Sequence, residues 1–185
     1  MKTFIHLASV AAVTLAASAA QGAYVNYSAT LVPPIQGPGN GSATFEFNTI
    51  THSLNIIVNF YMGIGATVAN IYSDTAVSGT GTAGVALALT GWPTGEENDY
   101  ANSINLLSTA SYSSAYLAAH GGTAASAETD LLAAMSNGRA YLNIQHIDSP
   151  YEQIDGFIYQ DVSVPAPGML ALIGMCGVLT GRRRR

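Results

Sequence analysis

The sequence predicts an all-β fold, an antiparallel β-sandwich with one or two short helices inserted. Charged residues make up only 9% of the 185-residue chain, whereas glycine, small polar residues and tyrosine are abundant, a composition typical of secreted β proteins. Apolar and polar residues also alternate in short runs bounded by glycine or proline. Segments 1–23 and 164–185 depart from this pattern, and the intervening residues 24–163 suit one domain with one core.

The strand signal is strongest over residues 42–60. Phe45 and Phe47 alternate with polar neighbours, and a short polar turn follows at 48–52. After the turn, the apolar residues share one face: Leu54, Ile56, Val58 and Phe60. This pattern predicts a hairpin with one face in a core. Further strands are expected at 68–72, 85–89, 140–147 and 153–162.

One helix is expected after residue 125, with Ser126 as its N-cap and Gly138 closing it. Glu128 and Asp130 would lie in its first turn, where acidic side chains favour the helix dipole. Its apolar side would consist of Leu131, Leu132 and Met135. A second, weaker helical pattern covers residues 109–119.

The N-terminal segment has the features of a secretory signal peptide. Lys2 precedes an apolar run over residues 4–17, and small residues follow it. Signal peptidase is expected to cut after Ala19 or near Ala23. The alternative is a membrane anchor, but the run is shorter than the roughly 20 residues that span a bilayer.

The C-terminal segment has three parts. It begins with Val164, Pro165, Ala166, Pro167 and Gly168, continues with an apolar run over 169–179, and ends with Arg182, Arg183, Arg184 and Arg185. The prolines break any preceding strand, and the arginines would hold the end of the apolar run in the cytoplasm. A marginal stop-transfer segment is therefore expected. The alternative is a buried core segment followed by a solvated basic tail.

This three-part order resembles the PEP-CTERM sorting signal, although Ala166 stands where that family usually has glutamate. The resemblance implies recognition and cleavage by an exosortase, with Pro165 and Pro167 in the processing site. It also implies a bacterium with an outer membrane that makes exopolysaccharide. The expected location is the cell surface or extracellular matrix, after transient insertion in the inner membrane.

Charge and cysteine content restrict the partners of the domain. All eleven acidic residues lie within 24–163, where Arg139 is the only lysine or arginine. Such a region repels phosphate backbones, so a nucleic-acid partner is excluded. The single cysteine, Cys176, lies in the sorting segment, so the domain has no disulfide and must be stabilised by packing.

Few residues indicate chemistry. The histidines at 52, 120 and 146 lack zinc-ligand spacing and are expected to be ordinary surface or turn residues; no metal site or cofactor is predicted. The segment 91–100 reads as a loop in which Glu96, Glu97 and Asp99 could offer oxygen ligands to calcium, without the spacing of an EF-hand. No serine lies in a nucleophile-elbow motif. Asp148 and Glu152 could form a carboxylate pair that cleaves glycans, but solvated acidic residues of a turn are the simpler interpretation.

The aromatic residues allow two interpretations. They could stack on sugar rings near predicted loops, but core or rim packing is the more common use of such side chains. The residues concerned are Trp92, Tyr100, Tyr112, Tyr116 and Tyr151.

The domain also resembles the CHRD family, named after chordin, over about residues 24–160. The resemblance rests on 31–34, 41–45 and 131–158, most clearly on Tyr141-Leu142-Asn143-Ile144. It implies an extracellular, immunoglobulin-like β-sandwich and no defined activity. Members commonly carry His-Ile-His, which aligns with Asn70-Ile71-Tyr72. A later histidine, glutamate and arginine align with Gln145, Gln153 and Asp155, so no metal or ion-pair role carries over.

Two functions of different class follow. The first is an exported non-enzymatic surface or matrix protein that associates with exopolysaccharide and presents an aromatic or acidic patch to solvent. The second is a small secreted hydrolase or metal-dependent enzyme, in which His120, His146 or the acidic segment would meet in one cleft. The absence of a visible nucleophile or metal motif favours the first.

Overall fold

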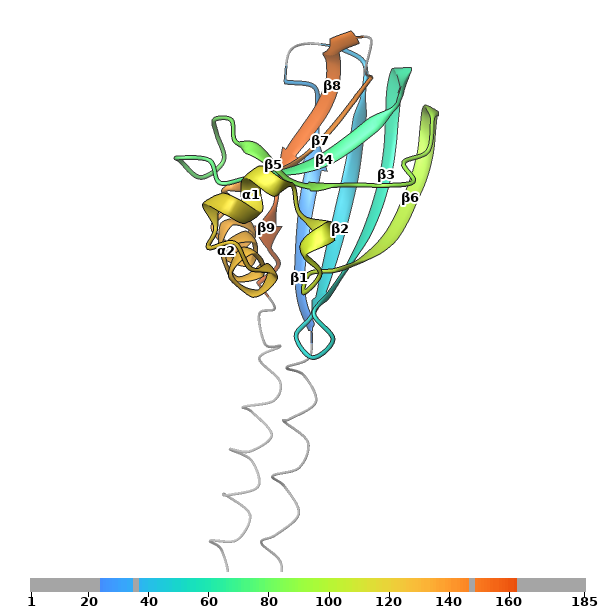
Figure 1. The fold of residues 1–185 in the computed structure, drawn as a ribbon. Helices are drawn as coiled ribbons and strands as arrows, with labels where there is room; N and C mark the ends of the chain where they lie inside the picture. The colour runs from blue at the N-terminus through green and yellow to red at the C-terminus, as the bar shows by residue number, and fades with distance from the viewer. Residues whose placement is uncertain (1–23, 35–36, 147–148, 163–185) are drawn as a thin grey trace, which may run out of the picture.

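Two antiparallel sheets pack face to face in the computed structural model, which describes residues 24–34, 37–146 and 149–162 (Figure 1). The five-stranded sheet has the order β6-β3-β2-β1-β9, with β1 Tyr24–Leu31, β2 Asn40–Asn48, β3 Ser53–Ala66, β6 Gly95–Asn105 and β9 Tyr159–Gln160. The four-stranded sheet has the order β5-β4-β7-β8, with β4 Val68–Ser73, β5 Gly84–Ala88, β7 Ala140–His146 and β8 Ser149–Phe157. The predicted all-β sandwich is confirmed.

The predicted hairpin is formed by β2 and β3. Phe45 lies opposite Ile56 and Phe47 opposite Leu54, and all four side chains are buried. The turn between the strands is closed by the Asn48 side chain, which accepts hydrogen bonds from the backbone N–H groups of residues 50 and 51 at 2.9 and 3.0 Å. This capped turn fixes the register of the hairpin and places every second side chain in the core.

The predicted loop at 91–100 is wrong from Gly95 onward, because β6 begins there and pairs with β3 along most of its length. Its sequence shows little apolar alternation, so nothing in the pattern marked it as a strand.

The strand expected at 153–162 is also wrong in extent. It divides at Ile158: β8 pairs with β7, whereas β9 pairs with β1, so the chain passes from one sheet to the other.

The sheets meet closely where β8 crosses β1. The backbone groups of Val32 and Asp155 exchange two hydrogen bonds of 2.9 and 3.0 Å. Beside them, a Cβ atom added to Gly156 would collide with the backbone carbonyl of Thr30. Glycine is therefore required at 156 for the two sheets to approach at this edge.

The helical region differs in detail from its prediction. Helix α2 spans Ala124–Ser136, and its N-cap is Thr123, whose hydroxyl accepts a hydrogen bond from the Ser126 N–H at 3.2 Å. Ser126 is thus inside the helix, and Glu128 and Asp130 lie beyond its first turn. Gly138 follows the end of the helix in the left-handed conformation, as the sequence predicts.

The second predicted helix is broken in two. A 3-10 turn, η1, covers Thr109–Ser111, and helix α1 covers Ser114–Ala119. Between them Tyr112 forms a bridge to Leu87 in β5. Ser113 then caps α1 by accepting a hydrogen bond from the Tyr116 N–H at 3.1 Å.

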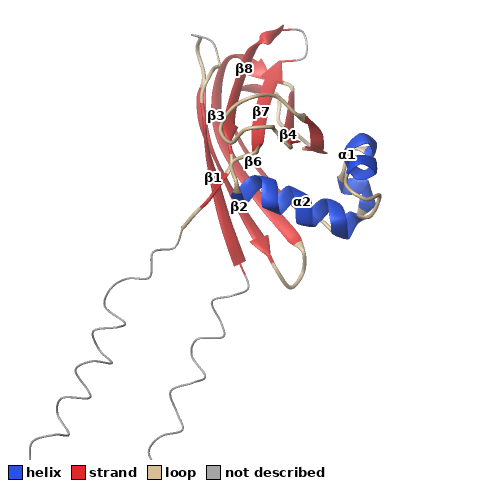
Figure 2. Ribbon diagram, turned by 90° about the vertical axis from the view of Figure 1, so that its left-hand side faces the viewer, coloured by secondary structure: helices blue, strands red, loops and turns tan. Residues whose placement is uncertain are grey.

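Both helices lie on the same side of the five-stranded sheet as the four-stranded sheet, with α2 below the strands of that smaller sheet (Figure 2). Strand β3 is 14 residues long, whereas the strands of the smaller sheet have between five and nine. Leu131 and Met135 of α2 are fully buried in the common core. Helix α2 therefore covers the part of the five-stranded sheet that the smaller sheet leaves open.

The two ends of the described domain lie together. Strand β9 runs antiparallel to β1, and the Asp161 N–H donates to the Asn26 carbonyl at 2.8 Å, two residues from the start of β1. The predicted signal peptide and sorting segment, with Ala19, Ala23 and residues 164–185, lie outside the described residues. Within the described part of the chain, no helix has the length and hydropathy needed to cross a membrane.

The close approach at Gly156 is testable. Gly156→Ala is expected to lower the free energy of unfolding by roughly 1–3 kcal/mol, because the methyl group must push β8 away from β1. Urea denaturation measures this loss. Gly84→Ala in β5 is the matched control, since a Cβ atom there meets nothing within 4 Å. A Gly156→Ala loss no larger than the control would contradict the packing described at this edge.

Candidate functional site

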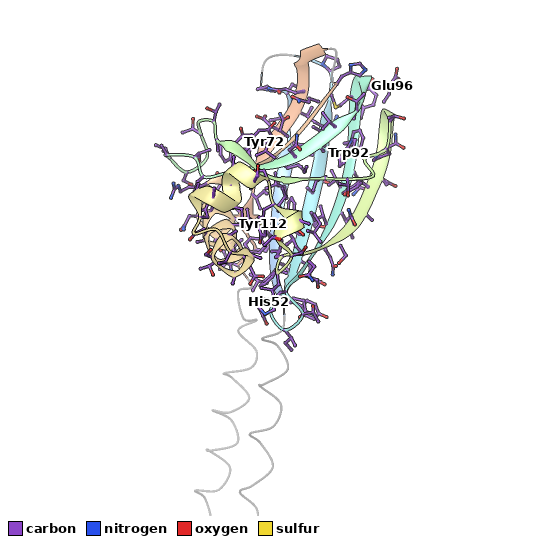
Figure 3. All side chains as sticks on the ribbon, in the orientation of Figure 1. His52, Tyr72, Trp92, Glu96 and Tyr112 are labelled. Atoms are coloured by element: carbon purple, nitrogen blue, oxygen red, sulfur yellow. The ribbon has the colours of Figure 1, made fainter. Side chains whose placement is uncertain are left out.

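The acidic residues expected in a calcium loop instead belong to the strand region around β6. Glu96 and Asp99 are strand residues, and Glu96 lies at the upper end of the sandwich (Figure 3). A strand directs successive side chains to opposite faces, so it does not gather oxygen ligands as a loop does. Within the residues that the structure describes, no group of three or more histidine, cysteine, aspartate or glutamate side chains is placed to hold a metal ion.

His52 is paired with a carboxylate rather than free on the surface. It lies in the turn between β2 and β3 with a φ of 55°, a conformation that few residues other than glycine adopt. Its Nδ1 atom is 2.7 Å from Oε1 of Glu128 in α2. Glu128 is only 8% exposed, and its Oε2 atom has no hydrogen-bond partner in the described structure. The pair thus fixes the β2–β3 turn to the helix.

The buried carboxylate affects a nearby tyrosine. Burial raises the pKa of Tyr112 strongly, and the negative charges of Glu128 and of ionised Tyr116 act in the same direction. The Tyr112 hydroxyl donates to the Leu106 carbonyl at 2.9 Å. Tyr112 is therefore a buried, neutral, hydrogen-bonded residue of the core.

A second histidine joins three elements. Nδ1 of His120 is 2.9 Å from Oδ2 of Asp130 in α2, and its Nε2 is 3.9 Å from Oδ2 of Asp74, which follows β4. Asp74 also forms an ion pair with Arg139 at 3.2 Å. The ring of Tyr116 stacks on His120 with centroids 3.9 Å apart, and burial raises the pKa of Tyr116 to about 12. This cluster binds α1 and α2 to the end of β4.

The two histidine contacts lie on different sides of α2. Glu128 and Asp130 are two residues apart, which separates their directions by roughly 200° on a helix. His146 lies at the end of β7, in another part of the fold. The sequence predicts ordinary surface or turn histidines, and His52 does lie in a turn. Both His52 and His120 also contact carboxylates of helix α2, which were not evident from local spacing.

The positions that the family resemblance singled out share one face of the four-stranded sheet. Asn70, Asn143 and Asp155 lie side by side across β4, β7 and β8, and Gln145 lies opposite Gln153 in the adjacent row. The Asn143 amide donates to the Gln153 side-chain oxygen at 3.0 Å. This face is turned away from the core, and its polar residues include the amides of Asn70, Asn143, Gln145 and Gln153 and the carboxylate of Asp155.

Aromatic rings border these amides. Tyr72 and Tyr141 stack in parallel with centroids 5.0 Å apart, and Phe157 lies 5.4 Å from Tyr141. Asp155 is the carboxylate in the row that it forms with Asn70 and Asn143, and burial raises its pKa. Partial loss of water thus disfavours the charged form of this group.

The aromatic residues considered for sugar stacking are mostly packed inside. Trp92 stacks on Phe60 at 5.1 Å and lies 4.6 Å from Tyr100, whose hydroxyl donates to the Thr90 carbonyl at 3.0 Å. Tyr112 and Tyr116 belong to the core cluster. The packing alternative is therefore confirmed for these four residues; the side chain of Tyr151 lies outside the described part.

The contact between His52 and Glu128 predicts a measurable coupling. His52→Asn keeps a residue that tolerates the left-handed backbone but removes the partner of a buried carboxylate, and is expected to lower the free energy of unfolding by roughly 1–3 kcal/mol. Glu128→Met should cost less, because the partly exposed imidazole keeps water. The loss of unfolding free energy in the double variant should be smaller than the sum of the two single losses, by more than about 1 kcal/mol. Strictly additive losses in urea denaturation would contradict the pairing.

The raised pKa of Asp155 predicts a pH dependence. Because the folded state binds this proton more tightly than the unfolded chain, stability is lost as the pH rises above the ordinary carboxyl pKa. Asp155→Asn removes the ionisable group and should raise the melting temperature at pH 7 by a small amount. The gain should disappear below about pH 4, where both states hold the proton. A gain that persists in acid, or a loss at pH 7, would contradict the assignment.

Comparison with models of protein families identifies the domain. The model of the CHRD domain matches residues 11–158, which is more than half of the chain. The match begins earlier than the resemblance read from the sequence and covers every strand except β9. No curated protein and no solved structure matches the chain. The chain belongs to the CHRD-domain family.

Proposed function

We propose that this chain is an exported, non-enzymatic protein of the cell surface or extracellular matrix, associated with exopolysaccharide. The proposal rests on the two predicted terminal signals, and the observation that supports it is that the two ends of the domain lie together. Asp161 is hydrogen-bonded beside the start of β1, so both signals would leave the sandwich from the same end. While the C-terminal segment is inserted in the membrane, the domain would present its faces and its opposite end to the surroundings.

The use of the ionisable groups supports a binding protein over an enzyme. General acid-base chemistry needs titratable side chains that converge where a substrate can reach them. In the described residues His52 and His120 contact different carboxylates of α2, and Arg139 pairs with Asp74. These groups hold helices to the sandwich. The hydrolase alternative needs them in one cleft.

Processing would involve two enzymes. Signal peptidase would remove the N-terminal segment, and an exosortase-type enzyme would act near Pro165 and Pro167 during transient inner-membrane insertion. Arg182 and the three arginines that follow it would hold the apolar run in place until cleavage. The mature protein would then remain among matrix polysaccharides.

Intact mass and cell fractionation test this proposal. The native protein is expected to lack both terminal segments and to occur in the surface or matrix fraction. A variant with Pro165→Ala and Pro167→Ala should retain the arginine tail and remain with the inner membrane. Wild-type protein that keeps its arginine tail in the cytoplasm would overturn the proposal.

A further inference from the structure

The outer face of the five-stranded sheet carries rows of short polar side chains. Asn26, Glu46, Asn55 and Ser103 lie in register across β1, β2, β3 and β6. Their neighbours along each strand point inward and are buried or partly buried, so these four point to the opposite side. We call this surface the polar face; it comprises the outward residues of these four strands.

The polar face is hollowed. A groove of about 650 Å³ is lined by this row and by Thr44, Ile57 and Ala101 in the adjacent row. Ile57 is 52% exposed and lies between Thr44 and the exposed Ala101. The groove therefore combines amide, hydroxyl and carboxylate groups with one large exposed aliphatic side chain, Ile57.

A second hollow continues along the same strands. It measures about 390 Å³ and is lined by Ser42, Asn59, Asp99 and Tyr61, among others. The Tyr61 side chain is 41% exposed. Because residues 57, 59 and 61 are alternate positions of β3, the two hollows lie along one strand direction. Together they suit an extended chain more than a compact small molecule.

The chemistry of the face selects a class of ligand. Sugar rings present hydroxyl groups at their edges and C–H groups on their faces. Asparagine amides and serine or threonine hydroxyls both donate and accept, and carboxylates accept strongly from hydroxyl donors. Ile57 and Tyr61 offer apolar contact for ring faces. Glu46 and Asp99 would repel anionic glycans, and the only lysine or arginine of the domain, Arg139, is paired with Asp74.

We propose that the polar face binds a neutral polysaccharide chain along β3, with its sugar rings over Ile57 and Tyr61 and its hydroxyls on the flanking amides and carboxylates. The inference rests on the proposed matrix function and names the surface and ligand class through which it acts. The four-stranded sheet is the less favourable surface, because its aromatic rings stack on one another and Asn143 at its centre is only 4% exposed. On the polar face the Asn55 amide donates to Oε1 of Glu46 at 3.4 Å, but both side chains remain accessible to solvent.

Affinity electrophoresis of the exported, processed protein tests the site. The gels contain dextran, galactomannan or hydroxyethylcellulose as neutral probes, and alginate as the anionic probe. At least one neutral polymer should retard the wild-type protein. Asn55→Ala should weaken that binding at least about tenfold, because it removes an amide from the centre of the groove. Asn70→Ala removes the same group from the other sheet and should change binding by less than about twofold.

A second variant protects the test against misfolding. Ala101→Trp fills the groove without removing any polar group and should abolish retardation while keeping the wild-type melting temperature. No retardation of wild-type protein in any neutral gel would overturn the inference, as would retardation in alginate alone. Equal binding by wild type, Asn55→Ala and Ala101→Trp would also overturn it. So would a dimer in size-exclusion chromatography that both variants convert to monomer without an effect on glycan binding.

Fractionation separates this inference from the function on which it rests. If the wild type and Asn55→Ala are both exported and processed but neither binds a neutral polymer, the binding face is wrong and the surface location stands. If the wild type is not exported, the proposed function fails whatever the gels show.

Discussion

The constraint on which the structure depends is the register of β1, β2 and β3. Alternate side chains of these strands enter one core, including Tyr27, Phe45 and Ile56, which are at most 3% exposed. A slip of one residue would exchange the whole buried set for the polar one. The turn capped by Asn48 and the pairing of β1 with β2 prevent that slip. The same register therefore creates both the core and the polar outer face.

The length of these strands explains the helices. The smaller sheet is too short to cover the inner face of β3, and the remaining apolar surface needs another layer. Helix α2 supplies it with Leu131 and Met135. The contact of Glu128 with His52 then joins this layer to the β2–β3 turn, and His120 joins α1 to α2. Histidine and carboxylate groups that suggest chemistry in a sequence thus serve to hold the layers of this fold together.

Much of the fold could be predicted because the signal was local. The β2–β3 hairpin follows from strict alternation, and the end of α2 follows from Gly138. Strand β6 was missed because its inward side chains include Asn102, whose amide donates to the Tyr100 hydroxyl at 2.7 Å. A polar residue that is satisfied by a neighbour two positions away removes the apolar period on which prediction relies.

The site was less predictable because it depends on pairing between strands. Asn26, Glu46 and Asn55 are unremarkable in sequence and become one row only through the register of three strands. The start of α2 was misplaced because Thr123 and Ser126 are both good N-caps, and their hydroxyls lie within 2.8 Å of each other. The His52–Glu128 contact joins residues far apart in the chain, which no local pattern records.

The most direct test of the account is an NMR titration of the isotope-labelled protein with a neutral oligosaccharide. Binding on the polar face predicts that the Ile57 methyl and Asn55 side-chain amide signals shift together. The methyl signals of Ile71 and Leu142, which are buried in the other sheet, should remain unchanged. Shifts centred instead on Tyr72 and Asn143, or no shifts at Ile57 and Asn55 on binding, would contradict this account. In that case the polar face of the five-stranded sheet would not be the binding surface.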